Sequence, residues 1–286
     1  MAKRWRRQAV EIMEKAVFLA MGIVICMPVF FVVTGSVMGN SDLRECLAPV
    51  FLEGKGFVTW KLIPDYPTLE NYSRLLVKSP QFFVLFWNSI KMTVFILAGQ
   101  MLVGVPAAWA FAVYRVKGKN LLFTLYVVLM LLPFQVTMLS SYLVLNKMTL
   151  LNTHWAVILP AVFNTFPIFV MYGGFCAIPG ALIEAARIDG ADEFFIFREV
   201  GIKLGKGGIL SSIVLGFLEY WNMIEQPLTF LKDKFLWPLS LYLPEIEWTQ
   251  AGFAFSASVV MLVPAVFMFV MGQDYLEQGI IYSGLK

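Results

Sequence analysis

The sequence predicts an all-α integral membrane protein with about six membrane-spanning helices, and three observations carry this prediction. Apolar and aromatic residues make up 59% of the 286 residues, and the mean hydropathy is +0.75. Charged residues make up only 14%, against about 25% in ordinary globular domains. Apolar stretches of about 20 residues, the length that crosses a bilayer core, recur along the chain. A soluble fold of this size has too little interior for so much apolar surface, which excludes a soluble enzyme, a disordered chain and a nucleic-acid binder.

Each predicted span is an apolar stretch long enough to cross the membrane as a helix. The first is too long for a signal-peptide core of about 7–15 residues and lacks a small-residue cleavage site, so we interpret it as a retained anchor. Each stretch contains proline, which kinks a membrane helix without excluding it. The six stretches are Ala16–Met38, Met92–Val113, Leu121–Leu145, Trp155–Ala177, Gly208–Leu231 and Ala251–Gly272.

The distribution of Lys and Arg predicts the orientation of the chain. With the N-terminus inside, 13 of these residues fall on the inner side and 8 on the outer side, five of them in a long loop where the rule is weak. Six crossings then place both termini in the cytoplasm. The predicted organisation is a basic N-terminus at 1–15, a transmembrane domain at 16–272 and a cytoplasmic tail at 273–286. The long outer loop is 39–82, and the long cytoplasmic loop is 178–207.

Cysteine and histidine provide no sign of a metal site, a cofactor or catalysis. The three cysteines, Cys26, Cys46 and Cys176, show no CxxC spacing. The single histidine, His154, lies beside Trp155 at the edge of an apolar stretch and is interpreted as interfacial. Metal-ligand sets and Ser-His-Asp triads need residues that are absent here, so we expect no metal, no cofactor and no enzymatic activity. The net charge of +3 is too small to indicate a polyanionic partner.

The cytoplasmic loop has the pattern of a short helix, a tight turn and a second helix. Pro179 suits a first helical turn, and the following residues to Ile188 are good helix formers. Gly190 can take the left-handed conformation that ends a helix, and Asp192 can cap the next one. Ala185 and Ala186 make one face thin enough for a partner surface to approach closely. The loop is either a helix that docks in a partner's groove or a plain re-entry elbow.

The fifth apolar stretch carries an unusual set of polar residues. Glu219 lies about 18 Å along a helix that starts near Gly207, close to the middle of a core about 30 Å thick. A carboxylate there is costly unless it faces a cavity or a partner. Glu219, Asn222 and Gln226 share a face of a continuous helix. Carboxylates and amides bind sugar hydroxyls, and aromatic rings stack on sugars. The candidates for a substrate path are Glu219, Tyr220, Trp221 and Asn222.

Two other interpretations of this stretch stay open. The polar residues can pair with another helix and have a structural role. Alternatively, the helix ends early and places Glu225 in the outer loop.

The cytoplasmic loop resembles the EAA loop of ATP-binding-cassette (ABC) transporter permeases. Glu184-Ala185-Ala186, three residues and Gly190 match fully, and after nine residues comes Val200-Gly201-Ile202-Lys203. The family usually has proline where Lys203 and Gly207 stand, so the loop's exit departs from the pattern. Other segments are similar to the carbohydrate-importing branch, of the maltose and glycerol-phosphate type. They include Pro67–Tyr72, Asn88–Lys91, Leu151–Thr153, Ile188–Ala191, Trp221-Asn222 and Gly279–Lys286.

The resemblance implies a type I importer permease fold with a cytoplasmic coupling helix, in a bacterial or archaeal inner membrane. It implies a second homologous permease, two ATPase subunits and an extracytoplasmic solute-binding protein as partners. The chain has no phosphate-binding loop of its own, which agrees with ATP binding on the partner ATPase subunits. The implied cargo is a sugar, an oligosaccharide or a related polyol or sugar phosphate. The residues implied to couple to the ATPase are Glu184, Ala185, Ala186, Asp189 and Gly190.

Two alternatives have less support in the residues. A secondary transporter driven by an ion gradient needs several intramembrane charges or an inverted repeat, and only two glutamates and no repeat are found. A membrane-embedded enzyme or assembly factor needs a cluster of His, Asp, Glu or Cys side chains, and the sequence has none.

Overall fold

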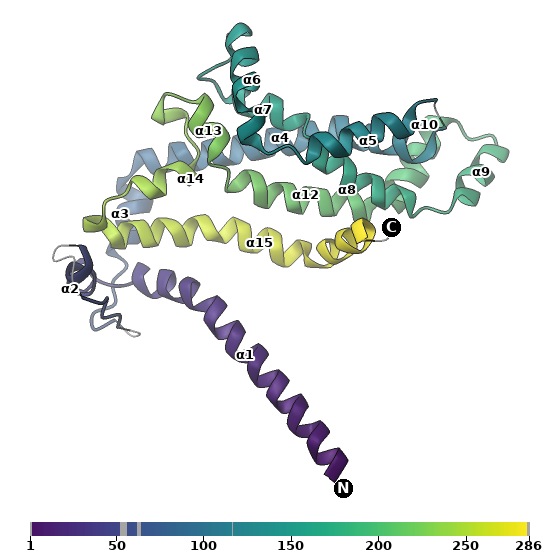
Figure 1. Ribbon diagram of the computed structural model, residues 1–286. Helices are drawn as coiled ribbons and strands as arrows, with labels where there is room; N and C mark the ends of the chain where they lie inside the picture. Colours follow the sequence, from purple (N-terminus) through teal and green to yellow (C-terminus); the bar gives the residue numbers. More distant parts are fainter. Residues whose placement is uncertain (1, 52–55, 62–63, 116, 285–286) are drawn as a thin grey trace. The chain divides into compact units, whose positions relative to one another are not determined.

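The structure is a computed structural model that describes residues 2–51, 56–61, 64–115 and 117–284, and these residues are mostly helical without a β-strand (Figure 1). The long and medium helices are α1 (Ala2–Ser36), α2 (Asn40–Phe51), α3 (Glu70–Lys78), α4 (Pro80–Val113), α5 (Lys119–Met130), α6 (Phe134–Lys147), α7 (His154–Val162), α8 (Thr165–Cys176), α9 (Gly180–Ile188), α12 (Lys206–Trp221) and α15 (Ala251–Gly284). The short helices are α10 (Glu193–Phe195), α11 (Ile202–Leu204), α13 (Glu225–Phe230) and α14 (Leu239–Tyr242). A π-helix, η1, joins them at Ile196–Gly201, with 3-10 turns η2 (Lys234–Leu236), η3 (Leu243–Glu245) and η4 (Trp248–Gln250).

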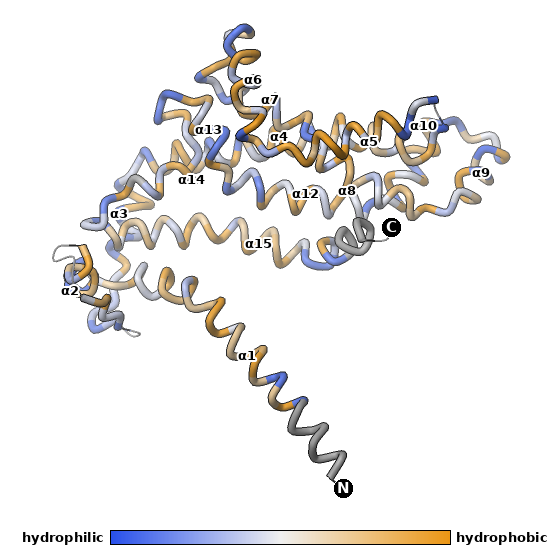
Figure 2. Tube along the Cα trace, in the orientation of Figure 1, coloured by the Kyte–Doolittle hydropathy of each residue, from blue (hydrophilic) through white to orange (hydrophobic). Residues whose placement is uncertain are grey.

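Four helical segments of the described chain are long and apolar enough to cross a membrane. Two further helix pairs pass the same test but are bent, α5 with α6 by 101° and the 193–204 segment with α12 by 66°. The prediction of about six spans therefore agrees with the structure when each bent pair counts as one. Apolar residues predominate along α1 and α15 (Figure 2). The four segments are Glu11–Ser36, Pro80–Val113, His154–Cys176 and Trp248–Glu277.

Three of the predicted spans are not only kinked at proline but consist of two helices separated by a short break. Leu121–Leu145 breaks between α5 and α6, Trp155–Ala177 breaks between α7 and α8, and Gly208–Leu231 breaks between α12 and α13. A proline lies at the N-cap or in the first turn of each second helix, where its missing N–H costs no helical hydrogen bond. These prolines are Pro133, Pro167 and Pro227.

The chain divides into two compact units, of which the first contains residues 1–80 and 245–262. The described side chains of α1 from 11 to 30 are all exposed, as expected for an anchor that faces lipid or a partner. The end of α1 packs on the start of α15, because Ser256 Oγ donates to Ser36 O at 3.2 Å. Trp60 Nε1 donates to Thr34 Oγ1 at 3.2 Å, and its ring lies edge-on to Phe255.

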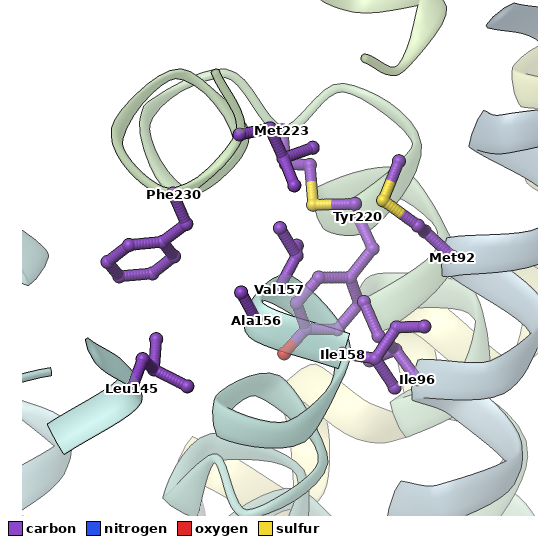
Figure 3. Packing of buried hydrophobic residues seen from close by; sticks show 10 residues of the cluster. Met92, Ile96, Leu145, Ala156, Val157, Ile158, Tyr220, Met223 and Phe230 are labelled. Atoms are coloured by element: carbon purple, nitrogen blue, oxygen red, sulfur yellow. The ribbon is translucent and has the colours of Figure 1, made fainter. Parts of the chain in front are cut away.

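The second unit contains residues 81–244 and 263–286 and has two buried apolar clusters. One cluster joins α4, α7 and the end of α12, with Tyr220 beside Val157 and Ile158 (Figure 3). The other surrounds Trp109 on α4 and Phe175 on α8. Helices α8 and α12 approach closely at two glycines: a Cβ on Gly174 would lie 2.9 Å from Gly208 Cα.

Side-chain to backbone hydrogen bonds hold the segment between α13 and α14 on the second unit. Asn88 Nδ2 donates to the carbonyls of Phe235 and Trp237, at 2.7 and 3.1 Å. Asn152 Oδ1 accepts from the backbone N–H groups of Lys232 and Asp233, both at 2.9 Å. A segment without regular helix is therefore held in one conformation.

Candidate functional site

A cavity of about 630 Å³ lies in the second unit, at the three places where the predicted spans are interrupted. Interrupted helices expose backbone polar groups, which the hydrocarbon region tolerates only where they are buried in protein or line a cavity. The lining residues come from α5 to α8, α12 and α13. They are Leu129, Met130, Leu132, Phe134, Thr137, Ser141, Val157, Pro160, Ala161, Phe163, Asn164, Thr165, Phe166, Glu219, Tyr220, Met223, Gln226 and Phe230.

Asn164 caps the helix that begins after the break between α7 and α8, and it also lines the cavity. Its backbone is extended at the N-cap of α8, and its Oδ1 accepts a hydrogen bond of 3.2 Å from Phe166 N. This bond satisfies one of the free N–H groups at the helix start and orients the side-chain amide. The Nδ2 group then donates to the Tyr220 hydroxyl at 3.1 Å.

Gln100 on α4 holds the same tyrosine from the other side. Its Nε2 donates to Ala161 O at 2.8 Å and to the Tyr220 hydroxyl at 2.7 Å. The backbone partners thus determine the orientation of both amides, and the Tyr220 oxygen accepts two hydrogen bonds. Since a phenol oxygen has two lone pairs, Tyr220 keeps its own proton as the group it can offer.

Glu219 is the single charged side chain among the residues that line this cavity. It is exposed, and no salt bridge joins it to another described residue. Thirteen residues separate it from the start of α12 at Lys206, which is about 20 Å of helix. The described residues contain no group of three or more His, Cys, Asp or Glu side chains that could hold a metal ion.

The structure separates the four residues predicted to line a path. Glu219 and Tyr220 line the cavity. Trp221 is buried, with ring centroids 5.8 Å from Phe86 and 5.5 Å from Phe217. Asn222 is exposed and donates back to Leu218 O at 3.0 Å. Of the four predicted residues, Trp221 and Asn222 are therefore not among those that line this cavity.

The predicted shared face of Glu219, Asn222 and Gln226 is also wrong, because α12 ends at Trp221 and Asn222 is its C-cap. Gln226 still reaches the cavity, but it does so from α13. Glu225 lies outside the lining and accepts a hydrogen bond of 2.7 Å from Gln135 Nε2 on α6. The helix therefore ends early, as one of the open interpretations had it, but Glu225 then begins α13 and does not lie in a loop.

Sequence reasoning missed Gln100 and Asn164. Each is the single amide side chain inside its apolar stretch, and this was the available signal, since a buried polar group in a membrane span needs a partner. It also missed the aromatic lining, because Phe134, Phe163 and Phe230 look like ordinary apolar residues in a sequence.

The loop 178–207, predicted to be cytoplasmic, has the expected helix, turn and second helix. Helix α9 ends at Ile188, and Gly190 has a φ of +82°. Gly190 N donates to Arg187 O at 3.1 Å and Ala191 N donates to Ala186 O at 3.0 Å, which is the Schellman pattern of a helix end. Asp192 caps the next helix, as predicted, and accepts from Phe195 N at 2.7 Å.

Charged hydrogen bonds join the two arms of the loop. The Arg187 guanidinium donates to both carboxylate oxygens of Glu193, at 2.7 and 3.2 Å, and the Tyr114 hydroxyl donates to the same carboxylate at 3.0 Å. The loop is therefore a defined element and not a loose connection.

The surface of this loop that faces away from the rest of the chain carries exposed apolar side chains, with Ile188 at 86% and Phe194 at 67% exposure. Ile183 on the inner side is buried. Among the predicted coupling residues Ala186 is half-buried and the rest are exposed: Glu184, Ala185, Asp189 and Gly190. Glu184 also lines a second cavity, of about 520 Å³, together with Tyr114, Arg115 and Arg187.

Comparison with known proteins identifies relatives over most of the chain. The family model described as binding-protein-dependent transport system inner membrane component matches residues 100–282. The chain is 29% identical to the arabinooligosaccharides transport system permease protein AraQ of Halalkalibacterium halodurans, over 78% of this chain and 81% of the relative. It is 23% identical to the sn-glycerol-3-phosphate transport system permease protein UgpE of Brucella abortus, over 91% and 92%.

A solved structure shares the fold. It is the crystal structure of a bacterial ABC transporter involved in the import of the acidic polysaccharide alginate. A chain of that structure matches with a TM-score of 0.80 and 19% identity, over 94% of this chain and 96% of that chain. This match confirms the predicted fold class, an all-α importer-type permease.

Proposed function

This chain belongs to the family of binding-protein-dependent transport system inner membrane components, and from that premise we propose that it is one of two permease subunits of an ABC importer for a sugar, an oligosaccharide or a related polyol or sugar phosphate. It is a multi-pass membrane protein, and ATP hydrolysis belongs to partner subunits. Because the chain belongs to this family, we prefer the importer to the alternative of a transporter driven by an ion gradient.

The observation that carries the cargo proposal is the chemistry of the 630 Å³ cavity. Its lining combines a carboxylate, two amides and four hydroxyl-bearing residues with aromatic rings. Sugars match such a lining, because their hydroxyls need hydrogen-bond partners and their C–H faces pack on rings. Relatives that carry names of oligosaccharide transport systems, AraQ and the galactooligosaccharides permease GanQ of Bacillus subtilis, support the same cargo class.

The cytoplasmic loop is the proposed contact with the ATPase. Its outer side offers a short helix with exposed apolar residues, and a helix laid into a groove is a common recognition mode. The charged bonds between Arg187, Glu193 and Tyr114 make the loop stiff enough to transmit motion to the helices on either side. We assign ATPase coupling to Glu184, Ala185, Ala186, Asp189 and Gly190.

The remaining partners follow from the same proposal. A second homologous permease completes the path, two ATPase subunits bind on the cytoplasmic side, and a solute-binding protein delivers cargo from outside. The excess of Lys and Arg in the predicted inner segments supports an orientation with both termini in the cytoplasm. Lipid surrounds α1, whose exposed apolar surface is unsuited to water.

The test is copurification followed by ATP hydrolysis in reconstituted membranes. An affinity-tagged chain should retain a second permease and an ATPase through purification from its native membrane. Addition of the solute-binding protein and one sugar of a panel should then stimulate ATP hydrolysis. Isolation of the chain without any ATPase, or uptake that follows an ion gradient and ignores ATP, would contradict the proposal.

A further inference from the structure

The charge of the cavity indicates which cargo within the proposed class it accepts. Glu219 is the one charged residue in the lining, which contains no Lys, Arg or His. No salt bridge to a described residue neutralises this carboxylate. The other polar lining residues are neutral: Thr137, Ser141, Asn164, Thr165, Tyr220 and Gln226.

A carboxylate with apolar walls acts over a longer range than one in water, because the surroundings screen it less. A second anion inside the cavity is repelled and also loses its hydration, with no cation of the lining to compensate it. A neutral hydroxyl meets no such repulsion and can donate a hydrogen bond to Glu219.

Tyr220 favours the same kind of group. Its oxygen already accepts hydrogen bonds from Gln100 and Asn164, so its proton is what remains to be offered. The carboxylate of Glu219 accepts only. A cargo hydroxyl can bond either group, because it donates to Glu219 or accepts from Tyr220, whereas a carboxylate or phosphate oxygen can only accept from the tyrosine.

We propose that this cavity takes an uncharged, hydroxyl-rich part of the cargo and rejects anionic groups, with Glu219 as the discriminating residue. This inference rests on the proposed function and narrows it to neutral sugars. It separates this chain from proteins with anionic cargo, such as the alginate importer of the same fold and the relative named for sn-glycerol-3-phosphate.

The first experiment measures the charge preference of the cavity without any cargo. In a protein with Cys26, Cys46 and Cys176 replaced by Ala, the variant Ser141→Cys places a thiol in the lining. Its rates of modification by a cationic and an anionic methanethiosulfonate are compared with the rates for a free thiol. We expect the cation-to-anion ratio to fall roughly tenfold on Glu219→Gln.

Glu225→Gln is the matched control. It makes the same chemical change six residues further along, on a side chain that is bonded to Gln135 and lies outside the lining. We expect this variant to keep the parent ratio. If Ser141→Cys reacts with neither reagent, Thr137→Cys provides the second thiol position. A ratio that Glu219→Gln leaves unchanged, or that Glu225→Gln lowers equally, overturns the proposal.

The second experiment measures cargo selection in the complete reconstituted importer. A neutral oligosaccharide that stimulates ATP hydrolysis is compared with its derivative oxidised at C6, which has the same length and carries carboxylates. We expect the parent to import the neutral form at least tenfold faster and Glu219→Gln to reduce this preference severalfold. The parent and the Glu219→Gln importer use the same solute-binding protein. Its own selectivity between the two sugars therefore cancels when the preferences of the two importers are compared.

The outcomes separate this inference from the proposed function. Import of the oxidised form at the neutral rate by the parent overturns the inference and leaves the importer intact. Failure of every oligosaccharide to stimulate ATP hydrolysis overturns the proposed cargo class, while the thiol ratio still reports the charge of the cavity. If the solute-binding protein excludes the oxidised form entirely, the thiol ratio decides.

Discussion

Single residues determine whether the cytoplasmic loop keeps its turn. Gly190 has a φ of +82° with no atom within 4 Å of a hypothetical Cβ, so a side chain there meets backbone strain and no steric clash. We expect Gly190→Asp to destabilise the turn by about 1 kcal/mol or more. The permease should stay inserted but retain less ATPase through purification and import more slowly. Gly180→Asp is the control, because that site is equally open and its φ is not positive.

Glu184 tests the same loop through charge instead of backbone conformation. The side chain is exposed on α9, so its replacement removes no buried contact. We expect Glu184→Lys to weaken ATPase retention and uptake, while the elution profile of the purified permease stays that of the parent. If Glu184→Lys and Gly190→Asp both keep the ATPase and transport normally, the loop is only an elbow between membrane helices.

Tyr220 is the residue on which the hydrogen bonds behind the cavity converge. Replacing Tyr220 with Phe leaves the amide groups of Gln100 and Asn164 each without one acceptor. Gln100 is buried, and the loss of a partner for a buried donor costs about 1–3 kcal/mol, so the apparent Tm of the purified permease should fall. Tyr142→Phe is the control, since no hydrogen bond joins its hydroxyl to a described residue, and an equal fall in both variants would contradict the assignment.

At the scale of elements, the interrupted helices explain why this membrane protein has a cavity. A continuous helix satisfies its own backbone and fills space, whereas an interrupted one leaves polar groups and a gap in the packing. Prolines favour the interruptions, because each lies at the start of the new helix, where its missing N–H removes no helical hydrogen bond. The three interruptions come together because α8 packs against both α12 and α5.

The close approach of α8 and α12 depends on a pair of glycines. A Cβ on Gly174 would lie 2.9 Å from Gly208 Cα, and one on Gly208 would lie 3.0 Å from Gly174 Cα. Since the obstacle is backbone, no side chain can move aside. We expect Gly174→Val to destabilise this packing by about 1–3 kcal/mol. The variant should lose its monodisperse peak in detergent, whereas Gly22→Val, at an open site on α1, should keep it.

At the scale of the whole molecule, the orientation in the membrane is the property that a reporter tests directly. A fusion after Lys286 should report the cytoplasm, and one near Lys61 in the long loop should report the outside. A fusion near Lys119, between the second and third predicted spans, should again be cytoplasmic. A cytoplasmic signal at Lys61 would contradict the six-span arrangement.

The sequence by itself determined the class of fold and the helix-turn-helix conformation of the loop 178–207, because both depend on local properties. Apolar length predicts a span wherever it occurs, and Gly190 and Asp192 act on the backbone beside them. The spacing of Glu184, Ala185, Ala186 and Gly190 was enough to indicate the family that the match over residues 100–282 confirms.

Only the tertiary structure decided which residues form the cavity. Hydropathy does not distinguish a continuous span from one that ends at Trp221 and restarts at Glu225. Trp221 and Asn222, which lie beside the break, do not line this cavity, and packing across α4, α8 and α12 joined Gln100 and Asn164 to Tyr220. Gln100 and Tyr220 stand 120 residues apart, and such contacts arise from the packing of helices and not from any local pattern.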